Sequence, residues 1–237
     1  NPLKVENGRY TLDFDGLERE LARPGTKVLL MSNPNNPTGR LWTPEELRRL
    51  GEMCLAHGVT ILSDDIHADL AMPGYRYTPL PSLSPELARA SVLLTSTNKT
   101  FNLGGLQMAT LAIGDEELRM RFNQAMCRYQ TRLDNLFGAV ALETAYEKCG
   151  YWLDQAVAYI DGNRRALEKF AEEHLPQLKF CPMEATYFSW VDFSGLGKGE
   201  GLESFLVEEC GVALTPGREF SEQYSQFMRV NLACRRE

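Results

Sequence analysis

Four short apolar runs alternate with helical patterns in the first half of the chain, and this alternation limits the possible folds more than any other feature. The runs are Lys27–Ser32, Val59–Ser63, Ser91–Ser96 and Met108–Gly114. Each is nearly continuous and rich in leucine or β-branched residues, which is typical of strands buried on both faces. Strand–helix–strand units at this spacing predict an α/β fold, with a mostly parallel sheet flanked by helices.

The segment between the first two runs carries a clear helix start. Thr43 is suited to the N-cap, Pro44 to the first helical position, and Glu45 and Glu46 to an acidic first turn. We expect the helix to end near Gly58, because glycine is favoured just past a helix C-terminus.

The pattern changes after about Asp115, where helical periods replace the alternation. Two later strand-like runs surround a short helix and predict a smaller C-terminal α+β domain. We expect a large domain over 1–150 and a small domain over 151–237, incomplete at its end. The expected helices are 115–128, 134–148, 150–174 and 201–210, and the expected strands are Tyr187–Phe193 and Phe227–Ala233.

Charge and cysteine content exclude several classes of protein. The net charge is −7 and no basic stripe is visible, which argues against binding a nucleic-acid backbone. No apolar run is long enough to span a bilayer, and the start lacks a signal-peptide pattern. Six cysteines without C-x-x-C spacing predict reduced thiols in a cytoplasmic protein rather than a zinc site.

Three polar clusters follow three of the predicted strands. They are Ser32–Gly39 (S-N-P-N-N-P-T-G), Asp64–His67 (D-D-I-H) and Ser96–Asn102 (S-T-N-K-T-F-N). In doubly wound sheets, ligands bind beyond the carboxyl ends of the strands. An amide, a carboxylate and a lysine are therefore expected to meet in one crevice.

Each cluster also has a simpler interpretation. The N-P-N-N-P-T-G string is rich in turn-forming residues and could be only a loop. Asp64, Asp65, His67 and Asp69 offer oxygen and imidazole ligands for a metal, although four ligands within six residues would be cramped. Lys99 could be an ordinary surface lysine.

The order N-N-P-T-G, D-x-x-H, S-x-x-K resembles the cofactor motifs of the fold-type-I pyridoxal-5′-phosphate (PLP) enzymes, the aspartate-aminotransferase superfamily. The resemblance covers essentially the whole chain, and Asn36, Asp64 and Lys99 are 28 and 35 residues apart. It implies PLP as the cofactor, an amino acid as the substrate and a homodimer as the assembly. It also implies that a natural N-terminal segment, with a Gly-rich phosphate turn and a ring-stacking aromatic residue, is missing here.

The resemblance assigns a role to each matching residue. Asn36 corresponds to the asparagine that hydrogen-bonds the cofactor's phenolic oxygen, and Asp64 to the carboxylate that holds the pyridine nitrogen protonated. Lys99 corresponds to the Schiff-base lysine that also moves the Cα proton. Ser96 matches a phosphate-binding hydroxyl, and Arg229 matches the arginine that binds the substrate α-carboxylate.

Several of these residues keep a structural alternative. The Ser96 hydroxyl could instead satisfy backbone groups at the strand end. His67, at the position where aminotransferases usually carry a tyrosine, could be a cofactor contact or a satisfied core histidine. Arg229 could form a structural ion pair.

Within the superfamily, the chain resembles the MalY/PatB-type cystathionine β-lyases. The D-D-I-H, K-T-F-N-L-G-G-L-Q and R-V-N-L-A-C runs carry this likeness. It implies a carbon–sulfur β-lyase that acts on L-cystathionine or related cysteine S-conjugates. An aminotransferase and a catalytically inactive binding protein remain alternatives. Two departures are Gln107, where aminotransferases place a phosphate-binding arginine, and Arg235, where the group usually has proline.

Overall fold

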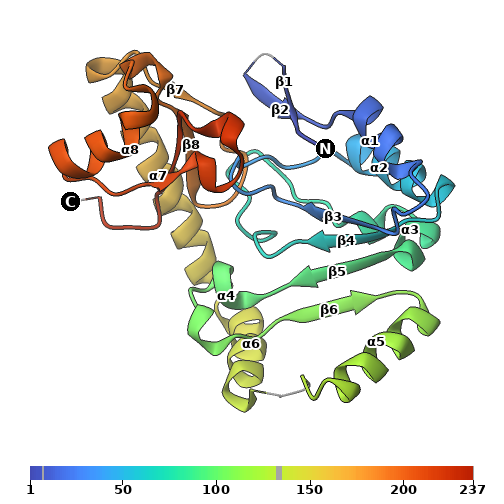
Figure 1. The fold of residues 1–237 in the computed structure, drawn as a ribbon. Helices are drawn as coiled ribbons and strands as arrows, with labels where there is room; N and C mark the ends of the chain where they lie inside the picture. The colour runs from blue at the N-terminus through green and yellow to red at the C-terminus, as the bar shows by residue number, and fades with distance from the viewer. Residues whose placement is uncertain (7, 132–134, 237) are drawn as a thin grey trace.

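The computed structural model describes residues 1–6, 8–131 and 135–236. Its larger sheet contains β3 (Val28–Ser32), β4 (Thr60–Asp64), β5 (Ser91–Thr95) and β6 (Thr110–Ile113), in that spatial order. The first three strands are parallel, and β6 is antiparallel to β5 (Figure 1). The predicted α/β fold with a mostly parallel sheet is therefore confirmed.

The helix after β3 forms as its sequence predicts. In α2 (Pro44–Ala56), Thr43 and Glu46 make a reciprocal capping box, which satisfies two backbone N–H groups at the helix start. Leu47, Leu50 and Cys54 of α2 are fully buried with α1 (Phe14–Leu21), α3 (Pro85–Ala90) and one face of the sheet. This layer forms the main apolar core.

The outer strand β3 is not buried on both faces, contrary to the sequence-based prediction. Leu29 and Met31 pack into the core under α1 and α2, whereas Val28 and Leu30 are 51% and 74% exposed. Successive side chains of a strand alternate between faces, and α1 and α2 cover only one of them. Among the described residues, no helix covers the other face of β3.

Three helices connect β6 to the second sheet: α5 (Glu116–Arg128), α6 (Leu136–Lys148) and α7 (Gly150–His174). The short α4 (Thr97–Thr100) lies between β5 and β6. The predictions for α5 and α7 hold to within one residue, and the predicted start of α6 at 134 lies outside the described residues. The long α7 runs from the neighbourhood of α4 and α6 to the second sheet (Figure 1).

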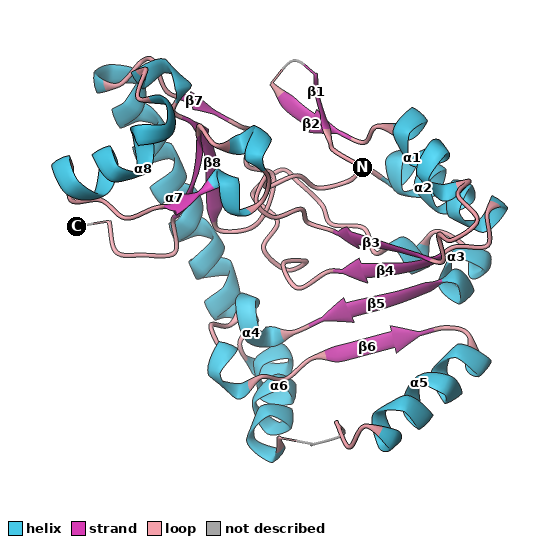
Figure 2. Ribbon diagram, in the orientation of Figure 1, coloured by secondary structure: helices cyan, strands magenta, loops and turns pink. Residues whose placement is uncertain are grey.

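The second sheet is antiparallel and lies near the C-terminal end of the chain (Figure 2). It contains β7 (Lys179–Phe180), β8 (Phe188–Asp192), β10 (Phe227–Asn231) and β9 (Thr215–Pro216), in that spatial order. The predicted helix at 201–210 is divided into α8 (Leu202–Ser204) and one π-helical turn at Phe205–Glu209. The two sheets lie on either side of residue 150, where α7 begins; the division into two domains stays a prediction.

A small hairpin of β1 (Lys4–Glu6) and β2 (Arg9–Thr11) lies at the N-terminus. In Figure 1 the arrowheads of β3, β4 and β5 point toward α7 and the second sheet. The loops that follow these three strands therefore lie between the two sheets. Within the described ranges, no helix is long and apolar enough to cross a membrane.

Candidate functional site

Asn36 and Arg229 meet across the boundary between the two sheets. Asn36 lies in the loop after β3, where its backbone N–H donates to Ser32 Oγ at 3.2 Å. Arg229 projects from β10, and its Nη1 donates to Asn36 Oδ1 at 3.1 Å. These residues are 193 positions apart in the chain, so the fold brings together two groups that the sequence predicted separately.

Arg229 has no carboxylate partner among the residues that the structure describes. Its guanidinium carbon lies 4.1 Å from the centroid of the Phe188 ring and 5.1 Å from that of Phe220. Burial lowers the pKa of Arg229 from its ordinary value, and its buried Nε has no hydrogen-bond partner. The structural ion pair is therefore not formed, and this cation keeps a free donor for an anion.

His67 is a second buried group with an unsatisfied atom. The side chain is 3% exposed, and its Nδ1 has no hydrogen-bond partner. Burial, followed by the charges of Lys99 and Arg229, lowers the His67 pKa to about 4, so the ring is neutral at pH 7. His67 packs edge-on against Tyr187 and Phe188. It thus differs from a satisfied core histidine.

Asp64, the last residue of β4, and Asp65, which follows it, differ in burial. Asp64 is exposed at the strand end, in register with Ser32 of β3, and accepts from Ile66 N at 3.3 Å. Asp65 is buried and accepts from Ser63 Oγ at 2.5 Å and from the Tyr77 hydroxyl. Burial raises the Asp65 pKa to about 6. Only Asp64 has a carboxylate oriented toward open space.

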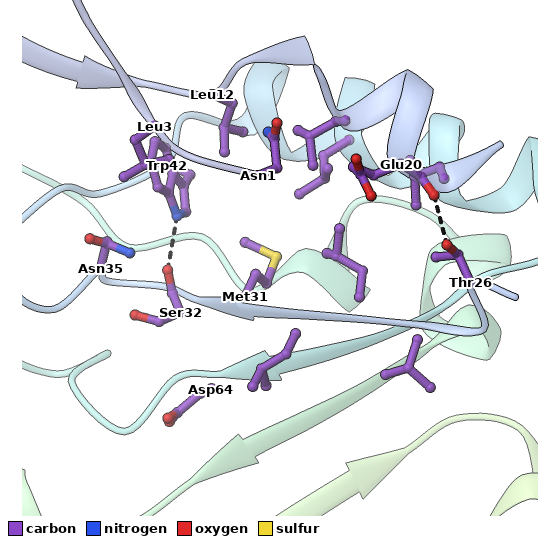
Figure 3. Close-up of a pocket in the computed structure, with 16 residues that line it drawn as sticks. Asn1, Leu3, Leu12, Glu20, Thr26, Met31, Ser32, Asn35, Trp42 and Asp64 are labelled. Carbon is purple, nitrogen blue, oxygen red and sulfur yellow. Dashed lines mark hydrogen bonds between the residues drawn. The ribbon is translucent and has the colours of Figure 1, made fainter. Parts of the chain in front are cut away.

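Asp64 lines a cavity of about 560 Å³ that runs along β3. Asp64 lies at one end of this cavity with Ser32 and Asn35 (Figure 3). Most of the remaining lining is apolar. The Trp42 indole closes this end by donating from Nε1 to Ser32 O at 2.9 Å.

Lys99 is exposed in α4, just after β5. It lines a second cavity of about 540 Å³, together with Asn231 of β10 and Tyr187, which immediately precedes β8. The next residue, Thr100, donates to Asp69 Oδ2 at 2.9 Å and fixes this turn against the loop after β4. In the described ranges, Lys99 forms neither a salt bridge nor a side-chain hydrogen bond.

The Ser96 hydroxyl is already engaged with the backbone. It donates to Met108 O at 2.5 Å and accepts from Asn98 N at 3.0 Å, which caps α4. These are the contacts of the structural alternative, and phosphate binding by Ser96 stays a prediction. Gln107 caps the following 3₁₀ turn with a left-handed backbone, φ 50°.

Sequence analysis missed Tyr187, Phe188 and Asn231, which line or support the site. Tyr187 and Phe188 begin the predicted strand Tyr187–Phe193, and aromatic residues are common in strands, so nothing in the sequence marked them as site residues. The signal that was available is their position next to Arg229 in the sheet, where Phe188 pairs with Asn231. The predicted metal alternative finds no support, since the described residues contain no group of three or more His, Cys, Asp or Glu side chains placed to share an ion.

The groups at this boundary have the chemistry that the predicted PLP needs, although Asp64 and Lys99 line two different cavities rather than the single crevice that the sequence predicted. A ring nitrogen can pair with the exposed Asp64, and the unpaired His67 Nδ1 and the Asn36 amide offer polar contacts for ring substituents. Lys99 has a free amine on an adjacent strand end. Arg229 has one unpaired nitrogen, Nε, for a carboxylate, while its Nη1 and Nη2 donate to Asn36 and Thr215.

Comparison with known proteins agrees with this arrangement. Residues 2–237 match the family described as aminotransferase class I and II. The chain is 39% identical over 235 residues to cystathionine β-lyase PatB of Bacillus subtilis (strain 168), covering 99% of this chain and 61% of PatB. It is 31% identical over 237 residues to the protein MalY of Escherichia coli (strain K12), covering 99% and 60%.

Solved structures give the same result. Cystalysin from Treponema denticola, which contains a PLP cofactor, superposes with a TM-score of 0.95 at 33% identity, over 98% of this chain and 59% of cystalysin. A PLP-bound C-S lyase from Staphylococcus hominis gives a TM-score of 0.90 at 31% identity, over 98% and 59%. The chain spans about 60% of the length of the relatives that it matches. It belongs to the class I and II aminotransferase family.

Proposed function

We propose that the whole protein is a PLP-dependent carbon–sulfur β-lyase. Its substrate is L-cystathionine or another cysteine S-conjugate, and its products are a thiol, pyruvate and ammonia. The relatives named as cystathionine β-lyase and C-S lyase support this choice of reaction. So does the sequence D-D-I-H at Asp64–His67, which resembles that group.

One observation carries the proposal. Arg229 is a partly buried cation whose buried Nε has no hydrogen-bond partner and which has no carboxylate partner in the described residues, and it lies beside the buried His67, whose Nδ1 also lacks a partner. Buried polar groups are nearly always hydrogen-bonded, so two neighbouring exceptions indicate a site for a ligand. A bidentate pair with the substrate α-carboxylate would use the unpaired Nε of Arg229 and one of its Nη nitrogens, which now donate to neutral oxygens of Asn36 and Thr215.

The chain's own residues then divide the work. Arg229 binds and orients the α-carboxylate, and the Lys99 amine accepts the Cα proton. Asp64 keeps the proton on the ring nitrogen, because an adjacent carboxylate favours the cation. Bound PLP supplies an electron sink for the charge left at Cα.

The bond changes balance with water as the only other reactant. Cα loses a proton to Lys99, the Cβ–S bond breaks, and the sulfur leaves as a thiolate. The three-carbon product then takes up water to give pyruvate and ammonia. A thiolate is a competent leaving group because its conjugate acid is fairly strong.

A neutral His67 is compatible with these proposed roles of Lys99, Asp64 and Arg229. With a pKa of about 4, it carries no charge near pH 7 and does not repel the Arg229 cation. It can therefore contact the cofactor ring although Lys99 and Arg229 lie nearby.

We further propose that the full protein is a cytoplasmic homodimer. The superfamily resemblance supports the dimer, since that superfamily builds its sites at a subunit interface. Sedimentation of the full-length protein tests this: a single species at twice the monomer mass is expected, and a monomer at working concentration contradicts it.

The reaction is tested with the full-length enzyme and L-cystathionine, without any keto acid. Repeated turnover to pyruvate and free thiol is expected. If product stops after one equivalent and resumes only with 2-oxoglutarate, the protein is an aminotransferase. If it neither shows the visible absorbance of bound PLP nor forms product, it is an inactive member of the family.

A further inference from the structure

Arg40 and Glu184 form a buried ion pair beside the site, 144 residues apart in the chain. Their side chains are each 2% exposed, and Arg40 Nη1 donates to Glu184 Oε2 at 3.0 Å. Arg40 Nη2 donates to both oxygens of Glu46, at 2.7 and 2.9 Å, and its Nε donates to Tyr10 O at 2.8 Å. Arg9 completes the group by donating to Glu184 Oε1 at 2.6 Å. Two cations and two anions therefore compensate one another, with Arg40 and Glu184 buried at the centre and the more exposed Arg9 and Glu46 on either side.

The pair reaches the loop that carries Asn36. Leu41 N donates to Glu184 Oε2 at 2.9 Å. Glu184 N and Ala185 N both donate to Gly39 O, at 3.0 and 2.9 Å. Gly39 has a left-handed backbone, φ 72°, and a Cβ there would lie 3.4 Å from Ala185 O, so the two segments are in close contact.

The same short segment reaches the loop that carries His67. Thr186 N donates to Leu70 O at 3.0 Å, and Met72 N donates to Glu184 O at 2.9 Å. Residues 184–186 are thus hydrogen-bonded to both loops, after β3 and after β4. Lys99, which follows β5, has no bond to this segment in the described residues.

On its other side, the segment leads into the sheet that carries Arg229. Thr186 has φ 74°, a conformation that β-branched residues rarely adopt, and its Oγ1 accepts from Phe188 N at 3.1 Å. Phe188 packs against both His67 and Arg229. The turn at Thr186 therefore fixes the direction of β8 relative to the loops after β3 and β4.

We propose that Glu184 is a positioning residue that sets Arg229 against the Asn36 and His67 loops, so that it controls affinity for the substrate α-carboxylate. This rests on the proposed function. Because the Lys99 turn is held separately, through Thr100 and Asp69, loss of Glu184 weakens substrate binding more than it slows proton transfer.

The test compares Glu184→Gln with Asp161→Asn in the full-length holoenzyme. Glu184→Gln keeps the shape and one oxygen for Leu41 N, but it removes the charge that faces Arg40. Asp161 is also a buried carboxylate, 4% exposed, and its ion pairs, with Arg164 and Arg165, stay within α7. It controls for the general effect of losing a buried ion pair.

With L-cystathionine, we expect Glu184→Gln to raise KM about 10-fold and to change kcat less than about twofold. Asp161→Asn should leave KM unchanged at a similar fall in Tm. Equal KM values in the two variants, or a loss confined to kcat, would overturn the proposal.

Amide hydrogen exchange of the cofactor-free protein gives a readout that does not depend on activity. Peptides that cover 39–41, 70–72 and 184–186 should exchange faster in Glu184→Gln than in the wild type, and not in Asp161→Asn. Unchanged exchange would refute the positioning role, whether or not the wild type proves to be a lyase. If wild type forms no product while exchange responds as expected, only the proposed reaction fails.

A milder variant keeps the test valid if Glu184→Gln does not fold. The Arg9 side chain is 42% exposed, and it bonds the other oxygen of Glu184. Arg9→Ala should shift KM and exchange in the same direction by a smaller factor, about twofold. A shift in the opposite direction, or none in either measurement, would contradict the proposal.

Discussion

Two groups of charged side chains lie at the boundary between the sheets, and they differ in how completely they are paired. Around Arg40, the nitrogen atoms of the guanidinium all donate, to Glu184, Glu46 and two carbonyl oxygens. Around Arg229, one buried nitrogen has no partner, and the nearest strong acceptor is an amide. Both arginines make contacts across the boundary between the two sheets, although Arg40 is fully buried and Arg229 is partly buried.

The difference supports a structural role for Arg40 and the proposed ligand-binding role for Arg229. A buried ion pair with all donors used holds two segments together, and removing one partner leaves an uncompensated charge. For Arg229, whose buried Nε has no partner, we propose that a bound ligand supplies the missing acceptor. The same contrast recurs on the loop after β4, where Asp65 has two donors and His67 has an unpaired Nδ1.

The largest effect is expected at the unpaired lysine. Lys99→Ala should lower turnover of the full-length enzyme about 10⁴-fold, because the group that accepts the Cα proton is lost. Its Tm should not fall, since Lys99 is exposed and makes no ion pair in the described residues. Lys148→Ala, at an exposed position on α6, is the matched control. Pyruvate formation and thermal melting measure the two quantities, and residual activity above a tenth of wild type would contradict the assignment.

The opposite behaviour is expected from the fully paired arginine. Arg40→Ala should lower the free energy of unfolding by about 4 kcal/mol, because Glu184 and Glu46 lose a buried cation. Denaturant titration of the full-length protein measures this value. A change below about 1 kcal/mol would break the comparison, since Arg40 would then be no more structural than Arg229.

A third effect should appear in the pH dependence of stability. The Asp65 pKa is about 6, above its ordinary 3.8, so its contribution is present below pH 4 and is lost as pH rises through 6. The His67 pKa is about 4, below its ordinary 6.5, so its contribution is present above pH 6.5 and is lost as pH falls through 4. Between pH 4 and 6.5 the two contributions oppose each other.

Substitution should separate these opposing contributions. Asp65→Asn should make the protein lose about 3 kcal/mol more stability than wild type on acidification from pH 6.5 to 4. His67→Gln should give a difference of opposite sign. Urea titrations of the cofactor-free protein at both pH values measure the differences. Stability curves parallel to wild type would show that the two groups are not titrating as their burial indicates.

The smallest effect is expected for a conservative change at the site. Arg229→Lys keeps the charge and loses the planar fork, so the KM for L-cystathionine should rise about 10-fold while the PLP absorbance stays. The free energy of unfolding should change little, since Arg229 forms no ion pair in the described part of the chain. Unchanged kinetics would remove Arg229 from the substrate site.

Much of this arrangement could be predicted from the sequence. The strand ends that carry Asn36, Asp64 and Lys99 follow from apolar runs and cap signals, which are local. The choice of Asp64 over Asp65 as the cofactor's partner stays a prediction, although the structure leaves only Asp64 open.

The remaining features depend on contacts between distant segments. Nothing near Arg40 in the sequence indicates that its partner is Glu184, and the aromatic residues 187 and 188 differ from ordinary strand residues only by their neighbours. The exposure of Val28 and Leu30 shows the same limit. An apolar run predicts a buried strand, but whether each face of the strand is buried depends on which distant segments pack against it.

The long separation of Arg40 and Glu184 has a consequence for synthesis. A ribosome adds about 5–20 residues per second, so the 144 residues between them take about 7–30 s to appear. During that time the parallel strands can associate while Arg40 stays hydrated and the loop after β3 has no fixed position. A nascent chain that stops before Glu184 would expose this loop to chaperones and proteases. The contacts between the loop after β3 and residues 184–186 can thus form only after Glu184 has left the ribosome.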